Sequence, residues 1–105
     1  AFHSASPTIV DCTFTANFAD DGGGMFNDFF SAPVLTDCEF TGNAADWNGG
    51  GMVNDYISAP IPTGCMFSSN SADCNGGGVF NYNASIRTIE RCTLTNNSAW
   101  QGGGM

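Results

Sequence analysis

The sequence repeats itself nearly four times with a period of 26 or 27 residues. The clearest copy runs from Asp37 to Asn54 and contains a cysteine, an asparagine and a triplet of glycines. The cysteines of the four copies stand at positions 12, 38, 65 and 92, and the glycine triplets begin at 22, 49, 76 and 102. A fixed period in the twenties is the signature of a solenoid, in which each repeat forms one coil and contacts only its neighbours.

Each copy holds a short segment in which apolar and polar residues alternate, as in a strand with one buried face. In the second copy Cys38 and Phe40 are predicted to point inward, while Glu39 and Thr41 point outward. Equivalent inward residues should stack into ladders along the solenoid, and these ladders are Cys12, Cys38, Cys65, Cys92 and Phe14, Phe40, Phe67, Leu94. A further apolar set lies an odd number of residues before the cysteines, so on a straight strand it would face the opposite side. The chain must therefore bend near residues 10–11 and their equivalents. The set comprises Ile9, Leu35, Pro62 and Ile89.

Asparagine, glycine and proline mark the predicted corners of each coil. Asn tolerates left-handed backbone angles, and stacked amides can hydrogen-bond from coil to coil, so strands are predicted to end at Asn17, Asn43, Asn70 and Asn97. The glycine triplet permits close approach of neighbouring chain. A buried strand is predicted to begin after each triplet, at Met25, Met52, Val79 and Met105.

These features predict an all-β protein, a right-handed parallel β-helix of about four coils with 26–27 residues per coil. We expect a single domain over residues 1–105, or a segment of a longer solenoid, with coils at 7–32, 33–59, 60–86 and 87–105. The formal net charge is −8, and Arg87 and Arg91 are the only basic residues besides one histidine. Because nucleic acids are bound by clustered Lys and Arg, we expect no nucleic-acid partner. No apolar run approaches the roughly 18 residues of a spanning helix, so we expect no membrane insertion of this segment.

The Phe-x-x-Asn spacing and the glycine triplet followed by an aliphatic residue carry a resemblance. They occur as Phe14 to Asn17, Phe40 to Asn43 and Phe67 to Asn70, and as Gly-Gly-Gly before Met25, Met52 and Val79. The chain resembles the repeats of the chlamydial polymorphic outer membrane proteins and related bacterial adhesin-like β-helices, with Gly in place of the Ala of their Gly-Gly-Ala. The resemblance implies an extracellular or cell-surface setting, in which such repeats serve as scaffold for adhesion and surface display.

We therefore expect a non-catalytic extracellular structural or adhesive solenoid. One alternative is a carbohydrate-active, pectate-lyase-like enzyme, since such enzymes share the architecture. Catalytic carboxylates are usually unique, whereas the acidic residues here recur with the repeat. The other alternative is an ice-binding solenoid, whose hydroxyl file would be Thr15, Thr41, Ser68 and Thr95; Glu39 and Met66 interrupt the neighbouring file.

No cofactor is expected, and Ca²⁺ is the one ion for which the chain offers candidates, in the acidic file Asp20, Asp46 and Asp73. The alternative, which we favour, is that these side chains splay into solvent. Thiols in a line do not converge on a tetrahedral zinc ion, so the cysteine ladder is predicted to be reduced core packing. Cys74 has no ladder partner and is predicted to be either an exposed thiol or an intermolecular link.

Outward aromatic side chains are the candidate partner contacts. They comprise Trp47 and Trp100 in the variable loops, and Phe29, Tyr56 and Tyr82 near a bend. Such rows bind glycans or a host surface in one interpretation, and pack locally as a lid over the loops in the other. Asn83 and Asn96 begin glycosylation sequons.

The sequence begins and stops inside a coil. Bare solenoid ends template association through unpaired strand edges. We therefore expect either end-to-end self-association into a filament or contact with neighbouring coils of the same longer chain.

Overall fold

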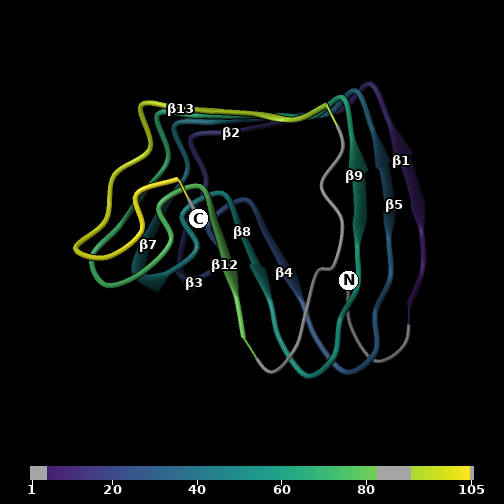
Figure 1. Ribbon diagram of the computed structural model, residues 1–105, viewed down its shortest axis with the longest axis horizontal. Coiled ribbons are helices and arrows are strands. Elements are labelled where there is room, and N and C mark those ends of the chain that lie inside the picture. Colours follow the sequence, from purple (N-terminus) through teal and green to yellow (C-terminus); the bar gives the residue numbers. More distant parts are fainter. Residues whose placement is uncertain (1–4, 83–90, 105) are drawn as a thin grey trace.

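The computed structural model describes residues 5–82 and 91–104, in which all strands are short and pair in parallel (Figure 1). The first coil contains β1 (Thr8–Val10), β2 (Thr13–Thr15), β3 (Phe18–Asp21) and β4 (Met25–Asn27). The second contains β5 (Val34–Thr36), β6 (Glu39–Thr41), β7 (Ala44–Asn48) and β8 (Met52–Asn54). The third contains β9 (Ile61–Thr63), β10 (Met66–Ser68), β11 (Ser71–Ala72) and β12 (Val79–Asn81), and β13 (Thr93–Thr95) lies in the fourth.

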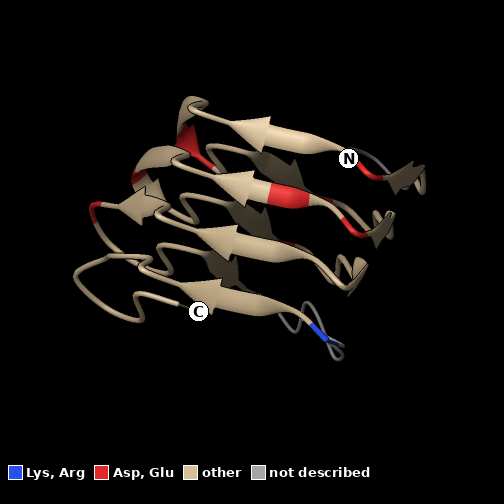
Figure 2. Ribbon diagram, turned by 90° about the horizontal axis from the view of Figure 1, so that it is seen from above, with Lys and Arg blue, Asp and Glu red and all other residues tan. Residues whose placement is uncertain are grey.

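Strands at the same place in successive coils form four sheets. Their orders are β1-β5-β9, β13-β10-β6-β2, β11-β7-β3 and β12-β8-β4. Figure 2 shows the coils stacked one above the next between the N- and C-terminal ends of the molecule. The predicted all-β parallel β-helix of about four coils is confirmed. Within the described residues, no helix is long and apolar enough to cross a membrane.

The register places equivalent residues directly above one another. Phe14 pairs with Phe40, Phe40 with Phe67, and Phe67 with Leu94. The step of 26 between the first two cysteines has a local cause, because Ala19 pairs with Ala45 but Asp21 pairs with Asn48. The second coil thus inserts one extra residue between these points, and the coil length varies only in this loop.

The core lies between the sheets and is formed by the inward ladders. Its fully buried members, each at most 1% exposed, are Leu35, Cys38, Phe40, Met52, Cys65, Phe67 and Val79. The Phe40 ring stacks on Phe14 at 4.6 Å between centroids and on Phe67 at 4.7 Å, with interplanar angles of 4° and 6°. Such aromatic contacts add about 0.5–1.5 kcal/mol each beyond area burial.

Residues of the outer coils are less buried than those of the middle coils. Ile9, Phe14, Cys92 and Leu94 are partly buried against the core, and Cys12 is exposed, contrary to the prediction of a buried ladder. The physical reason is that the described chain covers the first coil on one side only. Ile89 and Met105, which complete two predicted ladders, lie outside the described residues.

The corners are formed by residues with left-handed backbone angles. The predicted bend near residues 10–11 is made by Asp11, Asp37, Gly64 and Arg91, with φ of 52°, 51°, 64° and 49°. At the next corner the prediction that the Asn ladder adopts this conformation is wrong. The left-handed residue precedes the asparagine in each coil, at Ala16, Gly42, Ser69 and Asn96.

The glycine triplet combines a left-handed corner with a close contact between coils. Its first residue has a positive φ in each coil, for example 62° at Gly49. A Cβ on its third residue, Gly51, would collide with the carbonyl oxygen of Gly78 and lie 3.0 Å from the Phe67 ring. Only glycine lets the backbone pass this close to the aromatic ladder.

Candidate functional site

The predicted asparagine ladder consists of side-chain hydrogen bonds between successive coils. The Asn43 Oδ1 accepts bonds from the Asn17 backbone N–H and Nδ2, both at 3.0 Å. The Asn43 Nδ2 donates to the Phe14 carbonyl at 2.8 Å and to Asn70 Oδ1 at 3.1 Å. Asn70 repeats this pattern with Asn97 and with the Phe40 carbonyl. The side chains that the sequence assigned to coil-to-coil bonding therefore hold the coils in register.

The structure contains two further side-chain ladders that the sequence reasoning missed, one of amides alone and one that begins with a carboxylate. The buried set links Asn27 to Asn54 at 2.8 Å and Asn54 to Asn81 at 2.9 Å. The sequence did contain the pattern of this ladder, because Asn27, Asn54 and Asn81 each stand three residues after a glycine triplet. The second set is half-buried and lies at the surface; it comprises Asp21, Asn48 and Asn75.

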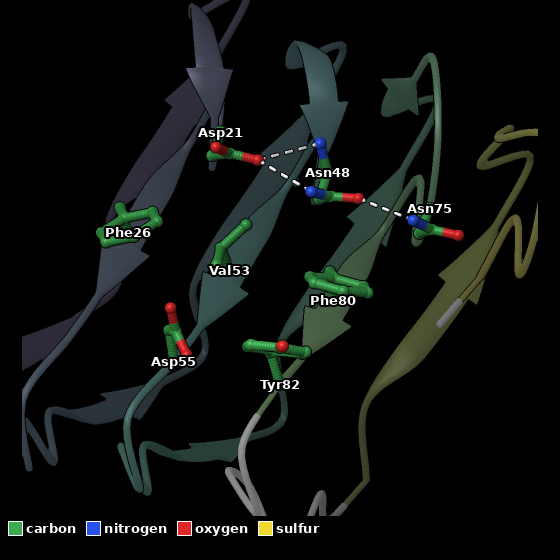
Figure 3. A pocket seen from close by; sticks show the side chains of 8 residues that line it. All are labelled: Asp21, Phe26, Asn48, Val53, Asp55, Asn75, Phe80 and Tyr82. Atoms are coloured by element: carbon green, nitrogen blue, oxygen red, sulfur yellow. Dashed lines mark hydrogen bonds between the residues drawn. The ribbon is translucent and has the colours of Figure 1, made fainter.

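A surface groove runs along the outer face of β4, β8 and β12 (Figure 3). Its volume is about 280 Å³. The floor is the outward row Phe26, Val53 and Phe80, which are register partners in three successive coils. Val53 is only 3% exposed and lies between the two larger side chains.

The two walls of the groove are polar and aromatic. On one side, Asp21 Oδ1 accepts bonds from the Asn48 backbone N–H at 3.1 Å and from its Nδ2 at 3.0 Å. On the other side Asp55 and Tyr82 occupy equivalent positions of adjacent coils (Figure 3). The Tyr82 ring lies beside that of Phe80, at 6.2 Å between centroids and 14° between planes. The groove thus joins aromatic surface to carboxylates.

The acidic file proposed for Ca²⁺ lies at the variable loop. Asp20, Asp46 and Asp73 are all exposed. In the part of the chain that the structure describes, no three His, Cys, Asp or Glu side chains form a group that could hold a metal ion. The register between the first two coils shifts between Ala19 and Asp21, so the pairing is irregular at Asp20.

The ladder cysteines are free thiols that bond to backbone carbonyls at the first corner. The Cys38 Sγ lies 3.4 Å from the carbonyl oxygens of both Ile9 and Thr36. Burial raises the pKa of the Cys65 thiol to about 11 from its ordinary 9.0. A deprotonated, reactive thiol is therefore disfavoured there. Cys74 is a half-buried free thiol in the variable loop.

The outward aromatics divide into two groups. Trp47 and Trp100 are 58% and 85% exposed, which is more open than the alternative of a local lid over the loops implies. Phe29 and Tyr56 stack on each other at 4.8 Å with an interplanar angle of 4°. They lie at the fourth corner, beside Phe30 and Ile57, and the four residues have positive φ between 45° and 62°.

The hydroxyl file bonds to the backbone, to the neighbouring file and, between Thr41 and Ser68 at 3.2 Å, within itself. The Thr15 hydroxyl donates to the Thr41 carbonyl at 3.1 Å, and the Thr41 hydroxyl donates to Glu39 Oε1 at 2.8 Å. Glu39 and Met66 are register partners in the neighbouring file, as expected. Of the two sequons, Asn96 is exposed at a left-handed corner, whereas Asn83 lies outside the described residues.

Comparison with known families supports the resemblance. Residues 64–82 match the Chlamydia polymorphic membrane protein (Chlamydia_PMP) repeat. The match covers one coil from its first corner through the strand behind the glycine triplet, and the other coils carry the same pattern. The repeat family suggests an outer-membrane or surface protein. No curated protein and no solved structure is significantly similar to the chain.

Proposed function

We propose that the chain is a non-catalytic extracellular β-solenoid with a structural and adhesive role. The observation that carries the proposal is the fourth corner, where large apolar side chains are held outward in a strained conformation. Phe30 and Ile57 are 61% and 51% exposed, with φ of 62° and 59°. A left-handed angle costs non-glycine residues about 1–2 kcal/mol each, and such strain clusters at functional sites.

The corner is held by its own hydrogen bonds. The Asp28 Oδ1 accepts the Phe29 backbone N–H at 2.8 Å, and the Asp55 Oδ1 accepts the Tyr56 backbone N–H at 2.7 Å. The Ser58 backbone N–H returns to the Asp55 carbonyl at 3.1 Å. Asn or Gly would occupy these turn positions without strain, so the bulky side chains are better explained by contact with a partner than by folding.

The absence of catalysis is supported by the roles of the acidic residues. Asp21 belongs to a ladder with Asn48, and Asp28 and Asp55 shape equivalent turns in adjacent coils. Carboxylates with repeated structural roles do not form the unique pair that glycoside hydrolysis requires.

End-to-end association is the structural half of the proposal. Phe14 and Leu94 each lie at an outer end of the aromatic ladder and are only partly buried. The β-helix ladder is continued most favourably by another coil of the same kind. That coil belongs either to a second copy, which gives a filament, or to the same longer chain.

Adhesion is tested by removing the corner side chains without removing the turn. Phe30→Asn with Ile57→Asn keeps a residue suited to left-handed angles and deletes the apolar surface. We expect this variant to retain the β-sheet circular dichroism spectrum and to lose binding to host-cell surfaces and immobilised glycans. A matched control is Thr13→Asn with Thr93→Asn, two exposed positions on another sheet. Equal binding by the wild type and the corner variant would overturn the adhesive proposal.

A further inference from the structure

The ladder cysteines stand in register directly behind the first corner. The Cys12 carbonyl accepts the Glu39 backbone N–H, and the Cys38 carbonyl accepts the Met66 backbone N–H, both at 2.9 Å. The aromatic rings two residues further along the same coils are 4.6 Å and 4.7 Å apart. Successive cysteines are therefore separated by one coil spacing, the distance between neighbouring parallel strands.

Successive thiols also share one side-chain orientation. The Cys38 Sγ lies 3.4 Å from the carbonyl oxygen of Thr36, and the Cys65 Sγ lies 3.6 Å from that of Thr63, in each case two residues earlier in the chain. Each sulfur also approaches a carbonyl oxygen of the preceding coil, at 3.4 Å and 3.7 Å respectively. Side chains that share an orientation and stand one coil apart place their sulfur atoms about 4.7 Å apart as well.

This separation decides which bond two neighbouring thiols can share. A disulfide requires an S–S distance of about 2.05 Å and Cβ atoms about 3.5–4.5 Å apart. The ladder cysteines are too widely spaced for that, and they are free thiols. A metal–thiolate bond is about 2.3 Å long, so an ion held in line between two sulfur atoms spans about 4.6 Å. The ladder fits a linear S–metal–S unit without a shift of the backbone.

We propose that Cys38 and Cys65 bind one soft monovalent metal ion of the Cu(I) class, in linear two-coordinate geometry between their sulfur atoms. Soft thiolate ligands select such ions. One metal cation and two thiols give one S–metal–S unit of charge −1 and two released protons, with no change in oxidation state. Both residues are only 1% exposed, so water does not compete for the ion. The inference goes beyond the proposed adhesive function and does not depend on it.

The exposed corner in front of this pair gives a cation a way in. Asp37 and Gly64 directly precede the two cysteines in the chain, and both are exposed. The Asp37 carboxylate occupies the space that a side chain on Gly64 would fill. Negative charge thus lies at the surface beside the residue that precedes Cys65, and it raises the local concentration of cations.

Other metal ions fit the ladder less well. Zinc requires four ligands that converge as a tetrahedron, and in the described part of the chain no three His, Cys, Asp or Glu side chains form a group of that kind. Calcium and magnesium take oxygen ligands. A linear ion requires only two sulfur atoms, which the ladder supplies.

The site is tested with Cu(I), supplied under anaerobic conditions as its acetonitrile complex. The protein is a variant with Cys12→Ser, Cys74→Ser and Cys92→Ser, whose remaining thiols are those of Cys38 and Cys65. We expect native mass spectrometry to find one ion per chain, and X-ray absorption to find two sulfur neighbours and no nitrogen or oxygen neighbour. Cu(I) should also raise the thermal unfolding midpoint, because an ion that binds the folded ladder stabilises it.

Cys65→Ser added to this variant should remove the bound ion. Serine keeps a hydroxyl that can donate to the same carbonyls, but its oxygen is a poor ligand for a soft ion. The matched control is Cys74→Ser in the wild type, which removes a free thiol outside the ladder and should leave the sulfur coordination and the midpoint shift unchanged.

Several results would overturn the inference. They are no binding, a third sulfur neighbour, and equal binding by a Cys65→Ser protein that circular dichroism shows to be folded. A midpoint that Cu(I) leaves unchanged or lowers would also overturn it, because the ion would then be held adventitiously by thiols of the unfolded chain. This last measurement is made on the protein that retains both ligands, so it stands even if Cys65→Ser fails to fold. The adhesive function is tested separately, through Phe30 and Ile57.

Discussion

The asparagine ladder predicts a large loss of stability from one small substitution, Asn43→Ala. Asn43 is fully buried, and its side chain makes four hydrogen bonds to Asn17, Phe14 and Asn70. At about 0.5–1.5 kcal/mol for each bond, the loss is about 2–6 kcal/mol. This is a large share of the roughly 5–15 kcal/mol by which a typical domain is stable.

Urea denaturation followed by circular dichroism measures this loss. We expect a lower midpoint with an unchanged slope, because the surface exposed on unfolding is the same. Asn43→Asp offers a partial case. It keeps acceptor oxygens for Asn17 but cannot donate to the Phe14 carbonyl or to Asn70 Oδ1, so it should also be destabilised. Asp46→Ala, an exposed change in the same coil, should remain within about 0.5 kcal/mol of the wild type. A loss below about 1 kcal/mol for Asn43→Ala would refute the view that the amide ladder holds the coils together.

Three further predictions follow from the core and the corners. Gly51→Ala should lower the free energy of unfolding by about 1–3 kcal/mol in the same assay, because the added methyl group meets the Gly78 carbonyl. Gly42→Ala has nothing within 4 Å of the added methyl group, so it should cost only the strain of a left-handed φ at an alanine, about 1–2 kcal/mol. The pKa of the Cys65 thiol is raised from 9.0 to about 11, so the folded state keeps a proton that the unfolded chain releases. Its contribution to stability should be complete below pH 9.0 and be lost as the pH rises towards 11. Native-state alkylation at pH 8, mapped by mass spectrometry, should label Cys74 before Cys65, and early labelling of Cys65 would contradict its burial. Ile57→Asn should raise the urea midpoint by the equivalent of about 1 kcal/mol, since Asn accepts the left-handed angle that strains a β-branched residue, and a lower midpoint would argue against stored strain.

The architecture could be predicted from the sequence because the repeat fixes it. In a solenoid, equivalent residues of successive copies must stack, so the positions of Phe14, Phe40 and Phe67 in the sequence already define a ladder. The alternation around Cys38 and Phe40 set which side chains point inward. The change of parity upstream required a bend, and the structure places a left-handed residue there at Asp37. One periodic pattern, read at the level of single residues, was sufficient for these conclusions.

The repeat could not predict which residue adopts the left-handed backbone angle at the second corner, near Asn43. Asn43 and the residue before it are both compatible with a left-handed angle, and Gly42 adopts it. The difference lies in tertiary hydrogen bonding, because the Asn43 amide lies between those of Asn17 and Asn70 and bonds to both. In the variable loop the second coil holds one extra residue, and only the strand pairing reveals that the register shifts between Ala19 and Asp21.

The sequence by itself determined the period, the coil and the inward ladders of this protein, since these depend on residues that repeat. The tertiary structure alone decided the groove, since it depends on residues that do not. Val53 is an ordinary apolar residue in the sequence, and it lies in the floor of the groove only because stacking places Phe26 and Phe80 on either side of it. Asp21 and Asp55 are likewise far apart along the chain and face the same groove only after the coils close. Local periodicity fixes what every coil shares, while contacts between coils turn the differences among them into a site.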